Sequence, residues 1–305
     1  MTVSWEKIDF TKASSGDPRY VNFRHCPICV ADNFTVVNQM KGFQFYTDDA
    51  INKQVDIINV ECRSCNALYM NPAYSAEGFD ALFREAGCSY GMTAGRTTEQ
   101  LNWLQDRDLL GKQTIFLDVG CGDGALMKCL PDHINCIGVD IDLYSIEKAK
   151  KNNSKANVEF VCANFDDFKI DLQPDLISMF HVLEHLPNPV GTLRHLRSIS
   201  KIGSHLIVEV PVIENGFTND IMSFFSPQHM THFSLGSFTQ CVKNAGWSIV
   251  EVFQQPDYNG TRILALNSQT ASIQNITQNS SQSQSLEDFL RLINKNLSLI
   301  HISEP

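Results

Sequence analysis

Four cysteines in two closely spaced pairs have the residue type and the spacing of a metal site. Cys26 and Cys29 stand in HCPIC, and Cys62 and Cys65 stand in ECRSC. Each Cys-x-x-Cys pair can place two thiolates on one ion, and two pairs complete the closed shell of four sulfurs that structural zinc prefers. Strand-like runs between the pairs predict a hairpin that returns the second pair to the first. The sequence predicts structural zinc, with iron in a rubredoxin-like site or a dithiol without metal as alternatives.

A second stretch, HVLEHLPNP at 181–189, carries the His-x-x-Glu-His pattern of one class of zinc proteases. That chemistry needs His181 and His185 on one face of a helix. The stretch follows a predicted strand directly, however, and Pro187 disfavours helical geometry at the residue before it. The pattern therefore does not predict a peptidase. Glu184 and His185 are expected either to anchor this loop as a buried pair or to contact a substrate.

The elements that position these residues follow from residue 114 onwards, where apolar strands alternate with helical segments. This alternation predicts an α/β fold with a parallel, doubly wound sheet. A helix is expected to begin after Asn188 as its N-cap, with Pro189 as its first residue. The expected strands are 114–120, 135–141, 157–162, 175–180 and 204–210.

A glycine-rich turn joins the first of these strands to the next helix, in LDVGCGDGAL. Glycines at such a turn let a ligand approach the backbone, and the helix offers its N-terminal N–H groups. The next strand ends in GVDID, where Asp140 can accept hydrogen bonds from both ribose hydroxyls. The sequence predicts a nucleoside-containing cofactor. Because the spacing is Gly-x-Gly-x-Gly and not Gly-x-Gly-x-x-Gly, a nicotinamide-dependent oxidoreductase is the weaker alternative.

The set LDVGCGDG, GVDID, ANFDDF and DLISMFHVLEHLPNP resembles the class I S-adenosylmethionine-dependent methyltransferases over roughly residues 97–253. The resemblance implies a Rossmann-like methyltransferase sheet with S-adenosyl-L-methionine as cofactor. It places the glycine loop at the methionine part, the acid after the second strand at the ribose, and Asn164 at the adenine edge. The cofactor-binding residues that it implies are Asp118, Gly120, Gly122, Asp140, Asn164, Phe165 and His181.

Methyl transfer needs a nucleophile in line with the leaving sulfur, and a base if the nucleophile starts as a hydroxyl or a C–H. The stretch HMTHFS supplies His229 and His232 just before a helix that Ser234 is expected to cap. Both histidines are base candidates, with His229 preferred, and loop anchoring is the alternative role. A metal held by these two histidines alone is not expected, because no third ligand is apparent nearby.

A four-cysteine module followed by this core resembles the sugar C-methyltransferases and related saccharide methyltransferases. The resemblance implies a nucleotide-linked sugar as acceptor, His229 as the catalytic histidine of PQHMTHFS, and Tyr90 in CSYGMTAGR as a lid residue over the substrate. Gln228 stands where those relatives carry an acid. Loss of that carboxylate makes methylation at carbon less certain than methylation at oxygen.

The amino-acid composition limits the classes of partner that the chain is expected to bind. The chain has 305 residues and a formal net charge of −10, which disfavours nucleic acid because affinity for phosphates comes from Lys and Arg. We expect a small-molecule, saccharide partner and neither nucleic acid nor membrane. With no signal-peptide core or membrane-length apolar run, a cytoplasmic location is expected. An RNA methyltransferase with a zinc module, and a non-catalytic zinc- and cofactor-binding protein, are the alternatives.

The composition also shifts along the chain. Residues 268–285 are polar and low in complexity, which predicts a flexible linker. The last nine residues, LSLIHISEP, translate codon for codon from a transposase sequencing adapter, so we expect the natural chain to continue past about Asn296. The expected units are a zinc module at 1–72, a helical connector and lid at 73–112, a methyltransferase domain at 113–267, a linker and the start of a further region at 268–296, and the adapter artefact at 297–305.

Overall fold

The computed structural model describes most of the predicted core. The described residues are 21–46, 52–75, 95–165, 168, 170, 172–215, 228–254 and 260–269. Tyr90, residues 76–94 of the predicted connector and lid, nearly all of the linker and the suspected adapter segment lie outside these residues. Within the described part of the chain, no helix combines the length and the apolarity needed to cross a bilayer.

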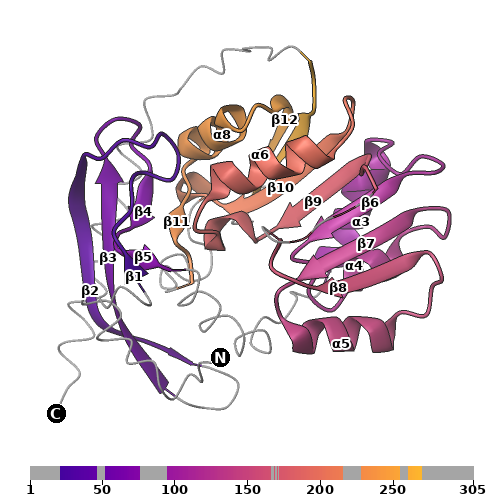
Figure 1. Cartoon of the computed structure of the whole chain (residues 1–305), viewed down its shortest axis with the longest axis horizontal. Helices are drawn as coiled ribbons and strands as arrows, with labels where there is room; N and C mark the ends of the chain where they lie inside the picture. The colour runs from indigo at the N-terminus through magenta and orange to yellow at the C-terminus, as the bar shows by residue number, and fades with distance from the viewer. Residues whose placement is uncertain are drawn as a thin grey trace.

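A seven-stranded sheet lies at the centre of the fold (Figure 1). All five predicted strands are present, and neighbouring strands among them run parallel. The last strand in the described part of the chain runs antiparallel between two others, so the sheet is mixed and not wholly parallel. In sheet order the strands are β12 (Ser248–Gln254), β13 (Gly260–Leu266), β10 (His205–Pro211), β9 (Leu176–Phe180), β6 (Ile115–Val119), β7 (Asn135–Asp140) and β8 (Val158–Cys162).

Helices cover both faces of this sheet, which confirms the doubly wound arrangement. Successive strand residues point to opposite faces, so Phe116 packs in one core cluster and Leu117 in the other. The Leu117 cluster includes side chains from two helices, and the Phe116 cluster includes side chains from three. The first pair is α6 (Pro189–Ile199) and α8 (Leu235–Asn244), and the other three are α3 (Arg96–Asp106), α4 (Ala125–Cys129) and α5 (Leu143–Asn152).

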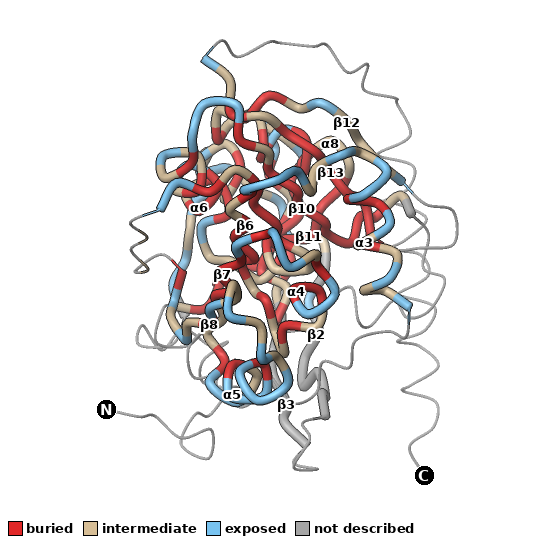
Figure 2. The backbone as a smooth tube through the Cα atoms, turned by 90° about the vertical axis from the view of Figure 1, so that its right-hand side faces the viewer, coloured by how far each residue is buried: buried red, intermediate tan, exposed pale blue. Residues whose placement is uncertain are grey.

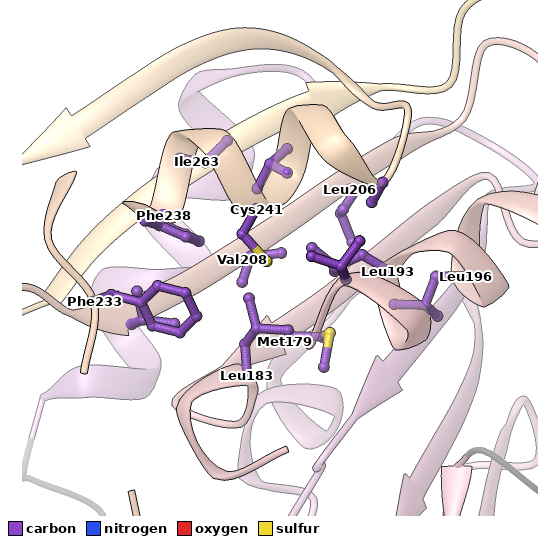
Figure 3. Close-up of a cluster of buried hydrophobic side chains, with 14 of the residues drawn as sticks. Met179, Leu183, Leu193, Leu196, Leu206, Val208, Phe233, Phe238, Cys241 and Ile263 are labelled. Carbon is purple, nitrogen blue, oxygen red and sulfur yellow. The ribbon is translucent and has the colours of Figure 1, made fainter. Parts of the chain in front are cut away.

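Buried residues run along the central strands, whereas exposed residues gather on the outer turns (Figure 2). On the α6 and α8 face, Leu193 and Leu196 of α6 meet Met179 and Val208 of the sheet (Figure 3). Phe238 of α8 packs into the same cluster. This core holds α6 and α8 against the strand ends where the predicted site residues lie.

The starts of these two helices follow the predicted capping chemistry. The side chain of Asn188 accepts a hydrogen bond from the N–H of Gly191, and Pro189 opens α6. Ser234 caps α8 by accepting from the N–H of Ser237, whose hydroxyl in turn accepts from the N–H of Ser234. Both predicted N-caps are confirmed. Each cap ends a loop that carries a candidate site residue.

The cysteine module forms a second, smaller sheet. The predicted hairpin is present as β2 (Phe34–Tyr46) and β3 (Asn52–Cys62), and β4 (Leu68–Met70) pairs with β3. The fourth strand of this sheet, β11 (Thr231–His232), comes from the segment just before α8. The module and the larger sheet are therefore joined by shared strand pairing, and module residues such as Ile28 and Tyr69 pack in the same core cluster as α6 and α8.

Arg24 holds this junction together. Its guanidinium donates to the carbonyl oxygens of Met70 in the module, Pro187 in the loop after β9, and Met230 beside β11. The guanidinium also lies over the ring of Tyr69. A planar group with several fixed donors suits this task because its geometry matches separate acceptors at once.

We predict that Arg24→Lys lowers the free energy of unfolding by about 1 to 3 kcal/mol, because one ammonium cannot satisfy three carbonyls in these directions. Denaturant unfolding measures the change. The exposed Arg63, which donates to the Thr35 hydroxyl, supplies the matched control. Arg63→Lys should change stability by less than about 0.5 kcal/mol, and equal losses in both variants would contradict the role of Arg24.

Candidate functional site

The predicted cofactor-binding residues lie at one edge of the large sheet. The four strands β9, β6, β7 and β8 are neighbours and parallel, so their carboxyl ends face the same side. The glycine loop follows β6, Asp140 ends β7, Asn164 follows β8, and His181 follows β9. In open α/β sheets, ligands bind in the crevice outside the carboxyl ends of the strands.

The glycine loop has the backbone that the sequence pattern predicts. Gly120 and Gly122 have φ values of 74° and 53°, in the left-handed region that favours glycine. A Cβ on Gly120 would overlap the side chain of Val182, so this glycine lets the loop after β9 approach. A Cβ on Gly122 would meet no atom within 4 Å. This open backbone is what a bound ligand needs for close contact.

Two carboxylates flank the loop, in different environments. Asp140 accepts hydrogen bonds from the N–H groups of Gly122 and Asp142, at 2.8 and 2.9 Å, one on each oxygen. Since each carboxylate oxygen can accept more than one hydrogen bond, Asp140 keeps acceptor capacity for a pair of hydroxyls. Asp118 is buried and accepts from the Ser178 hydroxyl. Burial is the main effect that raises the pKa of Asp118, to about 7.

The two residues at the predicted adenine edge differ in exposure. Asn164 is exposed, just beyond the end of β8. Phe165 is buried, and its ring lies 6.3 Å from that of Phe168 and 5.4 Å from that of His195 in α6. Asn164 therefore offers a polar group at the surface of this edge, whereas Phe165 supports the loop from below.

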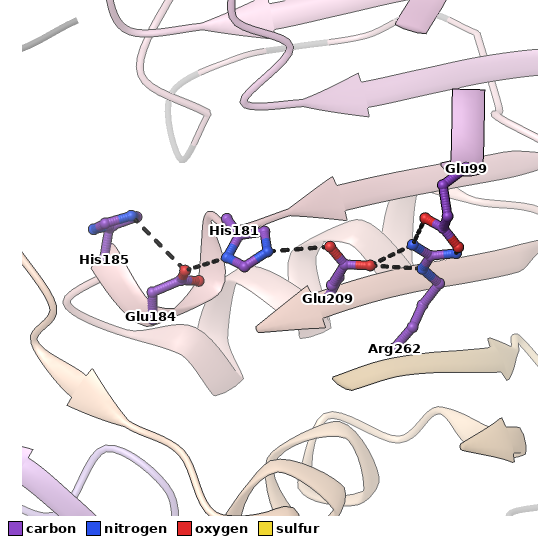
Figure 4. Close-up of polar contacts among 6 residues, drawn as sticks. All are labelled: Glu99, His181, Glu184, His185, Glu209 and Arg262. Atoms are coloured by element: carbon purple, nitrogen blue, oxygen red, sulfur yellow. Dashed lines mark hydrogen bonds and ion pairs between the residues drawn. The ribbon is translucent and has the colours of Figure 1, made fainter. Parts of the chain in front are cut away.

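His181 lies between two buried carboxylates (Figure 4). Its Nε2 is 3.1 Å from Glu209 and its Nδ1 is 3.4 Å from Glu184, and both glutamates are 1% exposed. Burial lowers the pKa of His181 and the two carboxylates raise it, with a net value of about 9. The sequence resemblance implies His181 as a cofactor-binding residue and does not indicate these ion pairs. The feature of the sequence that could indicate an ion pair here is Glu209, an acid inside an otherwise apolar strand.

The charged chain in Figure 4 continues across the sheet. Arg262 of β13, which is 1% exposed, donates to Glu209 and also to Glu99 of α3. Buried charges are costly unless they are paired, and here each charged group has a partner of opposite sign. The network links α3, β13 and β10 to His181, and so fixes the loop after β9 from the side opposite to the cysteine module.

The two histidines that are candidates for the base make different side-chain contacts. His229 packs edge-on against His185, with ring centroids 4.7 Å apart, and the N–H of Met230 donates to the carbonyl of Glu184. His232 is buried in β11, and its Nε2 lies 2.8 Å from the side-chain oxygen of Asn59 in β3. The ring of His229 thus packs against His185 in the loop after β9, whereas the ring of His232 binds Asn59 in the cysteine module.

That loop has no protease geometry. Leu183–His185 form a single turn of 3-10 helix, which confirms that no longer helix carries the His-x-x-Glu-His pattern. Instead Glu184, His185 and His229 come together, with one ligand atom from each lying within 4.8 Å of the other two. For His229 the fold supplies two neighbours with ligand atoms, Glu184 and His185. The partners come from a segment more than 40 residues earlier, and no local pattern in HMTHFS points to them.

The four module cysteines form a compact cluster. The Sγ atoms of Cys26 and Cys65 are 3.5 Å apart, and those of Cys29 and Cys62 are 3.6 Å apart. A tetrahedral zinc site with zinc–sulfur bonds of ~2.3 Å requires sulfur–sulfur distances of ~3.8 Å, so the donor set fits one metal ion. The two knuckles also share a backbone pattern, because Cys26 and Cys62 each donate an N–H to the carbonyl five residues later.

The pKa of Asp118 predicts how stability responds to pH. Its folded value of about 7 lies above the ordinary value of 3.8, so the folded chain binds an extra proton between them and becomes less stable as pH rises through this window. We predict that Asp118→Asn raises the free energy of unfolding by roughly 1 to 3 kcal/mol near pH 8, and by less near pH 5. Thermal melts of both proteins measure the difference, and a gap that does not narrow at the lower pH would contradict the prediction.

Comparison with known proteins points to one family. The family described as "Methyltransferase domain" matches residues 98–252. A ubiquinone biosynthesis O-methyltransferase of Coxiella burnetii is 32% identical over 106 residues, which are 33% of this chain and 44% of that protein. A tRNA (guanine-N(7)-)-methyltransferase of Rubrobacter xylanophilus is 34% identical over 99 residues, covering 30% and 43%. The chain thus spans less than half the length of these curated relatives.

Among solved structures, the magnesium protoporphyrin IX methyltransferase of Synechocystis PCC 6803 with bound SAH is 16% identical, with a TM-score of 0.47. The similar region covers 63% of this chain and 95% of that one. The family match spans residues 98–252, which are 155 of the 305 residues and include the glycine loop, Asp140 and the loop after β9. This chain therefore belongs to the methyltransferase-domain family.

Proposed function

We propose that this protein transfers the methyl group of S-adenosyl-L-methionine to an oxygen of a small-molecule acceptor, a nucleotide-linked sugar in the first instance. The observation that supports the cofactor is the glycine loop. Gly122 has open space where a side chain would lie, and Asp140 accepts from this loop with capacity left for ribose hydroxyls. Asp118, Gly120 and Gly122 would surround the methionine part, and Asn164 with Phe165 would border the adenine.

His181 would form the wall beside the methionine end. It follows β9, next to β6 in the sheet, and the neighbouring Val182 touches the glycine loop at Gly120. The side chain of His181 is held by Glu184 and Glu209. A rigid wall favours transfer because the acceptor must be aligned with the carbon–sulfur bond before reaction.

His229 is the residue that we propose to activate the acceptor. In the transfer, the acceptor oxygen bonds to the methyl carbon while the carbon–sulfur bond breaks and its electron pair returns to sulfur. The acceptor must also lose its proton, so a polar side chain beside the hydroxyl is needed. His229 is partly exposed and lies against the loop after β9, whereas His232 is buried against Asn59 and is better suited to holding β11 in place.

The proposal of a saccharide acceptor is based on the resemblance of the cysteine module and the following core to the saccharide methyltransferases. The proposal of methylation at oxygen is based on Gln228, which stands where those relatives carry an acid. Tyr90, proposed as a lid residue, lies outside the described residues. The net charge of −10 argues against an RNA acceptor, because counterion release from phosphates requires basic side chains. Retention of RNA by the protein at low salt would reverse this preference.

The cofactor assignment predicts binding by calorimetric titration. The wild-type protein should bind S-adenosyl-L-methionine with micromolar affinity and should not bind a nicotinamide dinucleotide. Asp140→Asn should weaken binding at least about tenfold, because hydrogen bonds to a carboxylate are lost. The exposed Asp132→Asn is the matched control and should bind normally.

The same assay separates binding from transfer. His229→Gln should keep its affinity for the cofactor and lose about a hundredfold in transfer to nucleotide sugars, measured as mass gain of the acceptor. If the folded wild-type protein binds neither S-adenosyl-L-methionine nor a nicotinamide dinucleotide, the proposed function is wrong. Cofactor binding with no transfer to any acceptor class would instead favour the non-catalytic alternative.

We also propose that Cys26, Cys29, Cys62 and Cys65 hold structural zinc, because four thiolates close the shell and leave no position for a substrate. Metal analysis should find about one zinc ion bound per module. Cys29→Ser should lose this zinc and lower the melting temperature, since the module packs in the same core cluster as α6 and α8. Cys129→Ser, at an exposed cysteine outside the cluster, should do neither.

A further inference from the structure

We propose that Glu184, His185 and His229 bind a divalent transition-metal ion, separate from the four-cysteine site. One ligand atom from each residue lies within 4.8 Å of the other two. Ligands bound at ~2.0 to 2.2 Å to a single ion lie about 3 to 4 Å apart, so a small closure around the ion completes the site. Glu184 and His185 come from the loop after β9, and His229 comes from the segment before α8. A hydrogen bond between His185 and Gln228, 43 positions apart in the sequence, joins the two segments.

The orientation of His185 favours a cation. Its Nδ1 lies 3.0 Å from the backbone carbonyl oxygen of Gln228. A carbonyl only accepts hydrogen bonds, so Nδ1 carries the proton, and in the neutral ring Nε2 presents its lone pair. Nε2 lies 3.9 Å from Oε1 of Glu184. A lone pair and a carboxylate oxygen that face each other at this distance leave room for a positive ion between them.

Glu184 provides the second argument. Its side chain is 1% exposed, yet neither carboxylate oxygen accepts a well-aligned hydrogen bond from the residues that the structure describes. Its nearest cationic neighbour, His181, is 3.4 Å away. His181 is shared with Glu209, so a metal ion beside Glu184 would give this buried carboxylate a positive partner of its own. The hydrogen bond of His185 to a backbone carbonyl is the type of outer contact that fixes metal-binding histidines in proteins.

The ligand set indicates the class of ion. Two imidazoles and one carboxylate suit zinc, iron(II), cobalt(II) or nickel(II), whereas magnesium and calcium prefer oxygen ligands alone. Three protein ligands also leave coordination positions open, unlike the closed four-cysteine site. His185 and His229 are only partly buried, so a ligand from solvent can reach this cluster.

Such an ion would define the acceptor more narrowly, and this part of the inference rests on the proposed methyl transfer. A hydroxyl bound to the ion has a lowered pKa and can release its proton to solvent water before its oxygen bonds to the methyl carbon. Adjacent oxygens, such as a vicinal diol, could fill two open positions and orient the acceptor. His229 would then activate the hydroxyl through the ion.

The test is titration of the zinc-loaded, metal-analysed protein with cobalt(II), followed by calorimetry and visible absorption. Wild-type protein should take up one further equivalent, with bands of a nitrogen and oxygen ligand set and no sulfur-to-cobalt charge transfer. Glu184→Gln and His229→Gln should each bind cobalt at least about tenfold more weakly. His133→Gln removes an exposed histidine outside the cluster and should bind as the wild type does.

Cofactor affinity and melting temperature verify that each variant is folded. If the buried Glu184→Gln protein does not fold, the partly exposed His229→Gln protein carries the test alone. Wild-type protein that takes up no cobalt beyond exchange into the cysteine site would overturn the proposal, as would unchanged binding in folded His229→Gln. Because cobalt binding is measured without acceptor, its failure leaves the proposed methyl transfer intact if S-adenosyl-L-methionine still binds.

Discussion

The guanidinium of Arg24 joins the four-stranded sheet of the cysteine module to loops of the seven-stranded sheet. Three backbone carbonyls, from Met70, Pro187 and Met230, accept hydrogen bonds from this one side chain. They belong to the cysteine module, the loop after β9 and the segment before α8. Each hydrogen bond to a charged donor contributes roughly 1.5 to 3 kcal/mol, which is enough to order loops that have little regular structure of their own. The candidate acceptor site lies where these segments converge.

A second constraint acts from the opposite side of the loop after β9. The chain of ion pairs from Glu99 through Arg262 and Glu209 to His181 crosses the sheet edge and reaches Glu184. Breaking one partner of a buried pair costs about 3 to 5 kcal/mol, so the arrangement resists rearrangement even where its net contribution to stability is small. The loop is held between a hydrogen-bonded clamp and a charged network, and both act on the same few residues.

This arrangement gives the cysteine module a function beyond its own stability. Pairing of β11 with β4 makes the module's sheet depend on residues that lie next to His229. A metal ion in the four-cysteine site would stabilise the knuckles, the knuckles order the module's sheet, and that sheet positions the segment before α8. The module therefore supports the segment that carries His229, through the backbone of residues 230–232.

Much of the larger unit could be predicted because its signals are local. Apolar strand runs, the glycine turn after β6, and the caps at Asn188 and Ser234 each depend on neighbouring residues. The strand order at the β12 and β13 end of the large sheet could not be predicted in this way. The antiparallel placement of β13 depends on how β10 and β12 pair with it over long sequence distances, and periodicity does not report such pairing.

The candidate site divides in the same way. By itself the sequence determined the two cysteine pairs, the cofactor edge at the ends of β6 to β9, and His229 as a polar residue before α8, because each is set by spacing within one short segment. Only the tertiary structure decided that His229 meets Glu184 and His185 while His232 turns to Asn59, and that Arg262 reaches His181 through Glu209. Those contacts join distant segments, and they exist because burial allows few arrangements in which every charge has a partner.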